Sequence, residues 1–471
     1  MTTTESSTVE PTTEDREQPD GVAASALDGL AADLRGRLVR PVDPDYDRTR
    51  AVFNGMIDRR PLAIAVCAGP SDVARGITFA REHDLVLSVR GGGHSVAGNA
   101  VCEGGIMLDL SAMKATRVDP QNRTARTEPG VTLGELDHET QAWGLATPLG
   151  VVSVTGVAGL TLGGGLGWLN GAYGLACDNL LSADVVTADG RLVTASEEAN
   201  EDLYWGIRGG GGNFGVVTSL RYRLHPVSTV LAGGLTYPLA DAPDVLRFYD
   251  GFVKAAPDEL STTASLAIAD SGQPVVTITV CYCGSVDGGE QVLRPLRTFG
   301  RRIDDTIQPM PYKTLQAAGD PGFPFGKLHY WRSGFLRDLT DEAIQTMIRF
   351  VERMPSPATG VGLQHMHGVA SRIHPSATAF AHRAVQWDFL VLSQWPDPAD
   401  TTPNIEWTQA FFAAMQPHLE NAVYVNNLGD EGDNRVRAAY GANYERLAAL
   451  KSKYDPTNVF RMNHNVQPAV P

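Results

Sequence analysis

Apolar runs and periodic apolar positions predict the elements of the first half of the chain. Uninterrupted apolar runs predict buried strands over residues 63–67 and 85–88. Apolar residues at helical spacing predict helices over residues 24–39, 71–83 and 132–143. A strand, a helix and a second strand in succession are typical of an α/β unit.

More strands are expected between residues 105 and 228. Residues 105–110, 183–187 and 216–220 are apolar runs, and residues 117–129 alternate as a hairpin does. Asp189-Gly190 follows one of these runs and is typical of a tight turn between two strands. The first half therefore predicts a mixture of helices and short strands.

The pattern changes after residue 228, where alternating apolar and polar positions predict longer strands. Such alternation is typical of an antiparallel sheet with one covered face, so we expect a second domain over residues 229–419. A helix over residues 433–451 follows, and Asp455-Pro456 ends it. The strands predicted in this half cover residues 233–237, 275–282, 364–369, 382–392 and 421–427, with helices over 242–254 and 341–354.

Three glycine clusters interrupt the first half, at Arg90–Ser95, 152–167 and 208–215. Glycine adopts backbone angles closed to other residues, so consecutive N–H groups can surround a phosphate. Residues 152–167 hold too much glycine for a stable helix or central strand. They predict either a close backbone approach to a planar ligand or a flexible linker. His94 follows the first cluster directly, so it faces whatever group the phosphates carry.

The glycine clusters do not match two common kinds of nucleotide site. They lack the Gly-Lys-Ser/Thr of P-loop hydrolases. They also lack the acidic residue that follows the Rossmann fingerprint by about twenty positions. A dinucleotide held by several separate loops is the interpretation that remains, and a flavin dinucleotide would use all three clusters.

Composition narrows the class of partner. The chain has 471 residues and a net charge of −15, which disfavours nucleic acid and anionic membranes because both attract basic surfaces. Its apolar runs are too short to span a bilayer. Residues 1–24 are expected to be a disordered tail, and they lack the apolar segment of a secretory signal. A cytoplasmic monomer or homodimer is expected.

The cysteines predict neither a disulfide framework nor a metal site. Five cysteines, an odd number, argue against systematic pairing. Cys281 and Cys283 lie two apart on one predicted strand, and further metal ligands do not accompany them. We expect them to be buried thiols.

Motifs at the end of the chain accompany the glycine clusters: Tyr424-Val425-Asn426, the segment Lys453–Phe460 and Asn463-His464-Asn465. In this combination and spacing, the sequence closely resembles the berberine bridge enzyme-like group of FAD-linked oxidases in the vanillyl-alcohol oxidase superfamily. The match extends from about residue 50 to the terminus and includes Cys177-Asp178-Asn179.

The resemblance implies an α+β fold with two domains. An FAD-binding domain of the PCMH type, made of two α/β subdomains, takes residues 25–228 and is completed by residues 420–471. A substrate domain with a large antiparallel sheet covered by helices takes residues 229–419 between them.

The resemblance also implies FAD that is bonded covalently to the protein at two positions. In bicovalent members of the group, the histidine matching His94 bonds the 8α-methyl carbon of the flavin, and the cysteine matching Cys177 bonds C6. Without the family motif, the simpler interpretation is that His94 is a turn residue and that Cys177 is a small buried hydrophobic residue. The other residues that the resemblance places at the cofactor are Arg90, Gly91, Gly92, Gly93, Ser95, Thr155, Gly156, Gly159, Gly164, Gly165, Gly167, Val217, Asn426 and Asn463.

The catalytic base is less well defined. The group's motif Tyr-x-Asn-Tyr is present here as Tyr424, Asn426 and Asn427, so its second tyrosine is absent. Gln364, His365 and His367 lie in one predicted strand, with the two histidines on the same face. A histidine with a pKa near neutrality would serve as a base, and a hydrated sheet surface is the alternative interpretation. His329, Tyr330 and Trp331 are candidates for the pocket wall.

These features predict an FAD-dependent oxidase that removes a hydride from an alcohol carbon to flavin N5 and reduces O2 to H2O2. The expected substrate is a carbohydrate or secondary-metabolite hydroxyl. The resemblance places Thr155 at the position that governs space near flavin C4a, and its small size favours oxygen access. The alternatives are a flavin dehydrogenase or oxidative cyclase on the same fold, or a flavin-binding protein without turnover.

Overall fold

The first sheet has a parallel centre and forms from the N-terminal residues. The computed structural model describes residues 22–469. Strands β2 (Ala63–Val66) and β3 (Leu87–Arg90) both pair in parallel with β4 (Ile106–Asp109), and β1 (Arg37–Val39) adds an antiparallel edge. Helices α1 (Ala24–Asp33) and α3 (Pro70–Glu82) pack their apolar residues against it.

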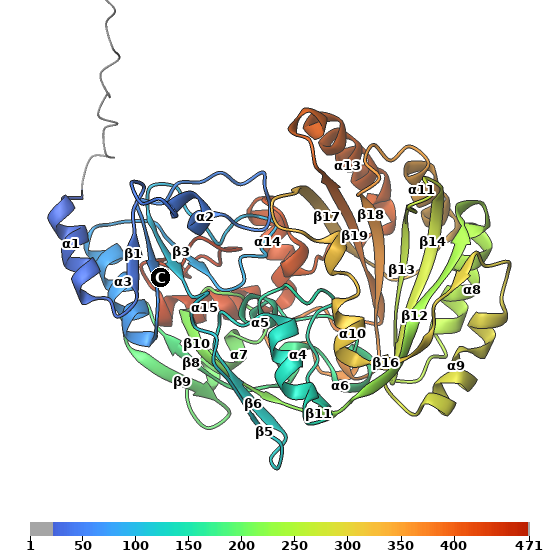
Figure 1. Ribbon diagram of the computed structural model, residues 1–471, viewed down its shortest axis with the longest axis horizontal. Coiled ribbons are helices and arrows are strands. Elements are labelled where there is room, and N and C mark those ends of the chain that lie inside the picture. Colours follow the sequence, from blue (N-terminus) through green and yellow to red (C-terminus); the bar gives the residue numbers. More distant parts are fainter. Residues whose placement is uncertain (1–21, 470–471) are drawn as a thin grey trace, which may run out of the picture.

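The second sheet is antiparallel and forms the other half of the N-terminal part (Figure 1). Its buried face packs against residues of the short helices α4 (Leu133–Gln141), α5 (Val157–Leu162) and α7 (Glu201–Gly206). A two-stranded ribbon of β7 (Leu145–Ala146) and β11 (His225–Pro226) lies apart from it. The strand order is β5 (Thr116–Asp119), β6 (Thr124–Thr127), β10 (Val216–Arg223), β8 (Leu180–Val186), β9 (Leu192–Ser196).

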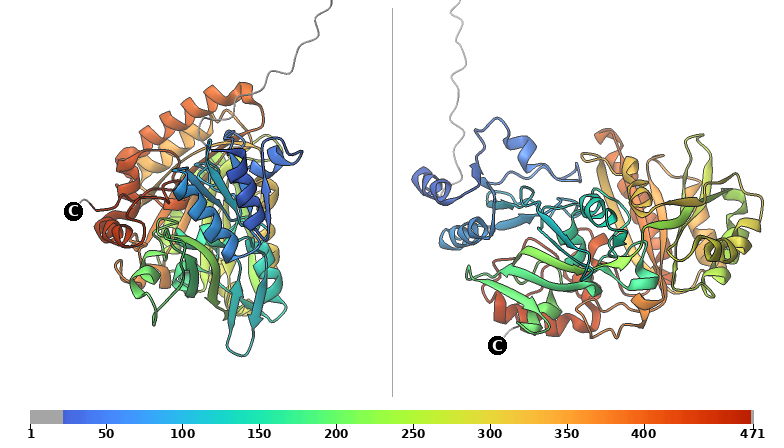
Figure 2. Two further views of the ribbon diagram at one scale, coloured as in Figure 1. Left: turned by 90° about the vertical axis from the view of Figure 1, so that its left-hand side faces the viewer. Right: turned by 60° about the horizontal axis from the view of Figure 1, so that its bottom comes forward.

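The third sheet is the largest and is antiparallel throughout. Helices α8 (Ala242–Val253), α9 (Val286–Thr298) and α11 (Asp341–Val351) lie on its outer face, away from the N-terminal part (Figure 1). The right-hand view of Figure 2 also places this sheet at the opposite end of the molecule from the blue N-terminal elements. The strand order is β15 (Asp304–Asp305), β12 (Thr229–Pro238), β14 (Pro274–Tyr282), β13 (Leu260–Ile268), β18 (Gly360–Met366), β19 (Gln386–Trp395), β17 (Leu328–Leu336), and β16 (Gln308–Pro311) pairs with β12.

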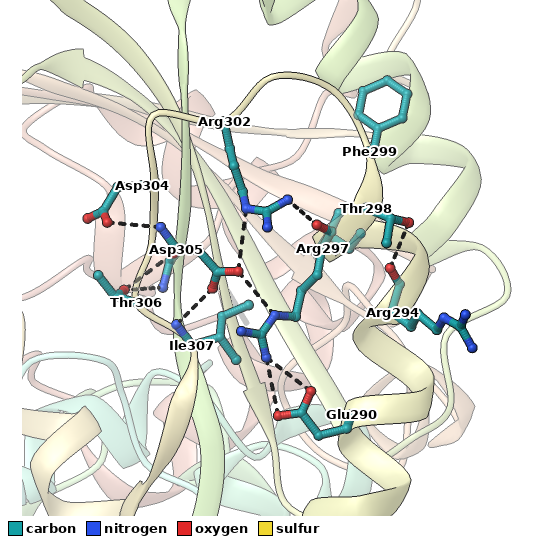
Figure 3. Close-up of polar contacts among 12 residues, drawn as sticks. Glu290, Arg294, Arg297, Thr298, Phe299, Arg302, Asp304, Asp305, Thr306 and Ile307 are labelled. Atoms are coloured by element: carbon teal, nitrogen blue, oxygen red, sulfur yellow. Dashed lines mark hydrogen bonds and ion pairs between the residues drawn. The ribbon is translucent and has the colours of Figure 1, made fainter.

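Arg297, in the last turn of helix α9, links that helix to one edge of the large sheet (Figure 3). Its Nε donates to Asp305 at 3.1 Å, and its Nη1 donates to Glu290 at 3.0 Å. The Asp305 carboxylate also lies 3.5 Å from Nε of Arg302. A short edge strand bound by charged groups is protected from pairing with another chain.

The C-terminal residues return from the large sheet to the N-terminal part (Figure 1). Helix α13 (Thr401–Met415) covers β17 and β19, and the chain then crosses back to α14 (Asp433–Tyr440) and α15 (Tyr444–Tyr454). Leu447, Ala448 and Leu450 of α15 join the core of the second sheet.

A fully buried ion pair holds the returning C-terminal segment in place. Nζ of Lys451 lies 2.6 Å from Asp455, and both side chains are 0% exposed. Nζ also donates to the carbonyl oxygens of Asn213 and Phe460, each at 2.9 Å. Burial lowers the pKa of Lys451, and the charge of Asp455 opposes that shift. The pair therefore joins α15, the third glycine cluster and the C-terminal segment.

The structure confirms several predicted elements. The predicted hairpin over residues 117–129 is β5 and β6, and the turn at Asp189-Gly190 joins β8 to β9. The α+β fold and the large antiparallel sheet covered by helices are both present. In the described part of the chain, none of the helices is long and apolar enough to cross a membrane. Most of the tail expected over residues 1–24 lies outside the described residues.

Two helix predictions are wrong in their extent. The helix expected over residues 24–39 ends at Asp33, because the backbone N–H groups of Arg35 and Gly36 donate to the Asp72 carboxylate and redirect the chain into β1. The helix expected over residues 433–451 is divided at Gly441, whose φ of 52° is not helical.

Two further predictions are wrong in the kind of element. Residues 421–427 contain only a 3₁₀ turn, Val425–Asn427, in place of the expected strand. This segment leaves the sheet to cross between domains, so it has no continuous neighbour to pair with. Residues 152–167 do contain a helix, α5, in spite of their glycine content. Val157, Ala158 and Leu162 of α5 are buried in the core, and that burial compensates for the poor propensity.

Replacing Lys451 by Met is expected to destabilise the protein by about 3–5 kcal/mol, because the Asp455 charge stays buried without its partner. Urea unfolding of the purified protein measures this. Lys453→Met is the matched control, since Lys453 pairs with Asp202 on the surface, and it should cost less than about 1 kcal/mol. Equal effects of the two substitutions would contradict the assigned role.

Candidate functional site

A cavity of about 730 Å³ lies where the three sheets meet. One wall comes from the glycine clusters of the N-terminal part, and the opposite wall is the inner face of the large sheet. The C-terminal residues Phe460–His464 close it from a third side. Segments that are far apart in the sequence thus surround one space.

The first glycine cluster is held by its flanks. Arg90 donates to both carboxylate oxygens of Asp109, with Nε at 2.9 Å and Nη2 at 2.5 Å. This pair holds the ends of strands β3 and β4 together. Gly93 has a φ of 70°, which favours glycine. A Cβ on Gly92 would lie 2.5 Å from the backbone nitrogen of Gly156. The first two glycine clusters therefore cross in direct backbone contact.

The cavity suits a dinucleotide with a planar ring. Gly159 and Gly212 both line it, and a Cβ on either would meet no protein atom within 4 Å, so it would project into the ligand space. Lysine and arginine are absent from its lining among the described residues. Backbone N–H groups of the glycine segments are left to hold a pyrophosphate. The buried Oδ1 of Asn463 also lacks a hydrogen-bond partner among the described residues and is suited to a ligand N–H.

His94 lines this cavity and is poised as a neutral imidazole. Burial lowers its pKa to about 4. Its Nε2 is buried and has no hydrogen-bond partner in the part of the chain that the structure describes. A neutral imidazole has a free nitrogen lone pair, so the side chain can form a bond to a cofactor.

Cys177 lies in a different environment. Its side chain is fully buried in an apolar cluster with Leu166, Phe380 and Tyr424, and it is not among the residues that line the cavity. Burial raises the pKa of its thiol, which disfavours the thiolate needed for bond formation. His94 therefore lines the cavity, and Cys177 does not.

A row of polar side chains crosses the inner face of the large sheet. Thr279, Thr263, Gln364 and Asp388 are direct partners across β14, β13, β18 and β19, and all four line the cavity. Strands are about 4.8 Å apart, so the row extends over about 14 Å. Beside it, Leu390 and Leu392 of β19 with Trp331 of β17 form an apolar strip of the same wall.

Asp388 is the one carboxylate among the described residues that line the cavity. Its side chain accepts hydrogen bonds from Ser333 Oγ at 3.0 Å and from Asn427 Nδ2 at 2.6 Å. Burial raises its pKa to about 7, and these two donors oppose the rise. A carboxyl group that titrates near neutral pH is suited to act as a general base.

Tyr424 lines the cavity but is a weak candidate for a base. Its hydroxyl accepts hydrogen bonds from the backbone N–H of Gly165 at 2.9 Å and of Leu166 at 3.2 Å, and from Asn426 Nδ2 at 2.7 Å. Burial nevertheless raises its pKa to about 12. At neutral pH it is a neutral phenol that fixes the glycine segment.

His365 and His367 do not reach the cavity. His365 pairs with Trp387 across the strands, stacks on His367 with ring centroids 4.8 Å apart, and lies on the face of β18 opposite Gln364. Nε2 of His367 donates to the carbonyl of Leu260 at 2.7 Å. Burial lowers the pKa of His365 to about 3. Of the predicted strand residues, Gln364 alone is positioned for a ligand.

Most of the predicted cofactor residues meet at the cavity. Those that line it are Gly91, Gly92, Gly93, His94, Ser95, Thr155, Gly156, Gly159, Val217, Asn426 and Asn463. Gly164, Gly165, Gly167, Arg90 and Cys177 lie outside it. A Cβ on Gly165 would lie 2.3 Å from that of Ala176, and one on Gly167 would lie 2.1 Å from Leu149 O. These two glycines permit protein–protein approach, not ligand approach.

Sequence reasoning missed Asp388 as a functional residue, and it noted Asn427 only at the place of the motif's absent second tyrosine. The available signal was an acidic residue within the apolar run Trp387-Asp388-Phe389-Leu390. Strand periodicity places such a residue on the face opposite Trp387 and Phe389, which pack against the helices. A buried acid on that face is a candidate functional group.

The fold and the cavity define a protein that binds a flavin dinucleotide between two domains. A family model for the FAD binding domain matches residues 61–196, and one for berberine and berberine-like proteins matches residues 423–467. An FAD-linked oxidoreductase of Dictyostelium discoideum is 32% identical, over 95% of this chain and 98% of the relative. The chain belongs to the berberine bridge enzyme-like family of FAD-linked oxidoreductases.

Two further comparisons agree with this assignment. (R)-6-hydroxynicotine oxidase of Paenarthrobacter nicotinovorans is 31% identical, over 92% of this chain and 97% of that protein. The crystal structure of 6-hydroxy-D-nicotine oxidase from Arthrobacter nicotinovorans matches with a TM-score of 0.86 and 29% identity, covering 93% of this chain and 98% of that one. The chain is therefore an FAD-linked enzyme with the fold of this family.

Replacing Gly212 by Val is expected to reduce flavin content strongly while leaving the fold intact, because the new side chain enters ligand space and meets no protein atom at Cβ. Absorbance at the flavin band relative to protein measures the content. Gly360→Val is the matched control, since Gly360 is equally open but does not line the cavity. Full flavin content in the Gly212 variant would place the cofactor elsewhere.

Proposed function

We propose that this protein is an FAD-dependent oxidase that removes a hydride from a carbon bearing a hydroxyl group and uses O2 as the acceptor. The observation that carries this proposal is the position of Asp388. It is a buried carboxylate with a pKa near 7, and it lines the same cavity as the cofactor-binding glycines and His94. Bound FAD supplies the hydride acceptor and passes the electrons to O2.

Asp388 accepts the proton of the substrate hydroxyl in this proposal. Ser333 and Asn427 donate to its two oxygens and hold the carboxylate plane. Gln364, the direct neighbour of Asp388 on β18, can both donate to and accept from a second substrate hydroxyl. Helices on the outer face and the apolar strip beside the row keep water from the base, which preserves its raised pKa.

The lining disfavours an anionic substrate and offers partners to several hydroxyl groups. The row Thr279, Thr263, Gln364 and Asp388 offers hydroxyl, amide and carboxyl groups in one line. Without a lysine or arginine among the described lining residues, a substrate carboxylate or phosphate would be buried unpaired, at a large cost. Leu390, Leu392 and Trp331 can pack against a ring face. A carbohydrate or a hydroxylated secondary metabolite fits this wall.

Covalent attachment of the flavin is proposed through His94 alone. This proposal leaves out the second bond expected through Cys177, because that thiol is outside the cavity lining and burial raises its pKa. A single bond prevents loss of the cofactor and leaves the other edge of the ring free. Cytoplasmic location and a monomeric or homodimeric state stay predictions.

Denaturation of the purified protein should leave flavin attached, since a covalent bond survives unfolding. Mass spectrometry and absorbance of the denatured chain measure it. His94→Ala is expected to abolish the attachment, whereas Cys177→Ala should retain it with an unchanged spectrum. Release of all flavin from the wild-type chain would exclude the covalent proposal, and a changed spectrum in the Cys177 variant would restore the second bond.

Asp388→Asn is expected to lower kcat by about 100- to 10,000-fold with the flavin content unchanged, because the amide cannot accept the proton. In the wild type, kcat/KM should fall as the pH drops below about 7, where Asp388 becomes protonated. Asp137→Asn is the matched control, since Asp137 is equally buried with a pKa raised to about 8 but does not line the cavity. Similar losses in both variants would remove Asp388 from the mechanism.

Mixing anaerobically reduced enzyme with air should reoxidise the flavin rapidly, because Thr155 lines the cavity, is small, and by the family resemblance would lie near flavin C4a. Stopped-flow absorbance follows the reaction, and Thr155→Leu should slow it. Slow reoxidation of the wild type would assign a dehydrogenase. A flavin that stays oxidised with every neutral polyol tested would support a flavin-binding protein without turnover, while peroxide release would exclude that alternative.

A further inference from the structure

Three aromatic rings form one stack, of which only His94 lines the cavity. The rings of His94 and Phe53 are parallel within 16°, with centroids 3.9 Å apart. On its other face, Phe53 stacks on His329 at 4.3 Å and 24°. Phe325 meets both Phe53 and His94 edge-on, at 5.7 Å and 6.3 Å. The imidazole of His94 is thus one end of a stack whose other end, His329, belongs to the substrate domain.

Stacking on Phe53 restrains the His94 ring. Its Nε2 has no hydrogen-bond partner among the described residues, so a polar contact at that atom does not set the ring angle. Phe53, by contrast, is fixed at both ends of its backbone. Its N–H donates to the carbonyl of Gly93 at 3.0 Å, and its carbonyl accepts from the N–H of Gly326 at 3.0 Å. The face offered to His94 is therefore rigid.

His329 is fixed from the opposite side. Its Nδ1 accepts a hydrogen bond from Trp331 Nε1 at 3.3 Å. The Asn54 side chain bonds both backbone groups of His329, donating to its carbonyl and accepting from its N–H, each at 3.1 Å. Asn54 Nδ2 also donates to the carbonyl of Val96 at 2.8 Å. Strand β17 is in this way bonded to the chain that follows His94.

The geometry points to Phe53 and His329 as positioning residues for the attachment of the flavin to His94. This inference rests on the proposed covalent bond. The stack sets the plane of the imidazole before the bond forms, and through His329 it makes that step depend on the substrate domain. A reacting nitrogen held in one orientation loses less entropy on reaching the bonding geometry.

The stack would assist one step, the formation of the covalent bond between His94 and the flavin. A C–N bond forms between an imidazole nitrogen of His94 and the methyl carbon at position 8 of the flavin. One C–H bond of the methyl group and the N–H bond of the imidazole are broken, and both hydrogens leave as protons. The two electrons released reduce the flavin ring, and O2 then reoxidises it to give H2O2. A neutral imidazole is required, and burial holds His94 in that form.

Substitutions at His329 separate stacking from simple filling of space. His329→Leu keeps apolar volume but removes the flat ring, whereas His329→Phe keeps the flat ring. His225→Ala is the matched control. His225 stacks on Tyr173 with the same spacing, 3.9 Å and 16°, as His94 on Phe53, yet neither residue of that pair touches His94 or lines the cavity.

The full-length chain, produced under riboflavin limitation, is mixed with FAD in air, and the covalent fraction is followed with time in acid-denatured samples. His329→Leu is expected to slow attachment by about two- to tenfold, as the loss of one aromatic contact predicts. His329→Phe and His225→Ala should attach flavin at the wild-type rate. Non-covalent FAD affinity, measured on the same samples, should change little in all three. Thermal unfolding should shift by a similar amount in His329→Leu and His329→Phe, because both lose the acceptor for Trp331 Nε1.

The outcomes separate this inference from the proposed function. If the wild type never acquires covalent flavin, the attachment proposal itself fails. If the wild type does so and His329→Leu keeps its rate, the stack has no positioning role. Equal slowing by His329→Phe would also overturn it. Should His329→Leu fail to fold, His329→Gln, which keeps an acceptor for Trp331 Nε1 but has no flat ring, carries the same test.

Discussion

The backbone contact between Gly92 and Gly156 is the constraint on which the site depends. A Cβ on either residue would lie 2.5 Å from a backbone atom of the other, so the two glycine segments can cross only without side chains. Their crossing brings β3 of the first sheet against the segment that leads into α5 of the second. The cavity opens beside this crossing, and both His94 and Thr155 take their places from it. The flavin site is thus a consequence of how closely two backbones approach.

The other wall of the cavity depends on the large sheet. Its alternation sends Trp387, Phe389 and Val391 into the helix-covered core and leaves Asp388, Leu390 and Leu392 on the cavity face. A carboxylate placed there loses its hydration, and its pKa rises towards neutrality. The same burial that stabilises the domain therefore raises the pKa of the proposed base. The Lys451–Asp455 pair completes the arrangement, because it holds the third glycine cluster and the C-terminal segment together.

The sequence predicted the fold class, and most of the residues that it proposed for the cofactor line one cavity, since both follow from local signals. Apolar runs and glycine clusters specify strands and tight turns within a few residues, and the terminal motifs carried the family resemblance. The predictions failed where a distant contact decided the local structure. Asp72 ended the first helix by binding the N–H groups of Arg35 and Gly36, and the core stabilised α5 against its own glycine content.

The sequence by itself determined that His94 follows a glycine nest and that the chain has the motifs of an FAD-linked enzyme. Only the tertiary structure decided which residues share the cavity. Cys177, His365 and His367 have the chemistry of site residues in the sequence, but packing places them outside the cavity lining. Asp388 lies within an apolar run of the sequence, yet its buried side chain lines the cavity. The reason is physical: reactivity depends on burial, on charge and on neighbours across strands, and all three are set by contacts between residues that are distant in the sequence.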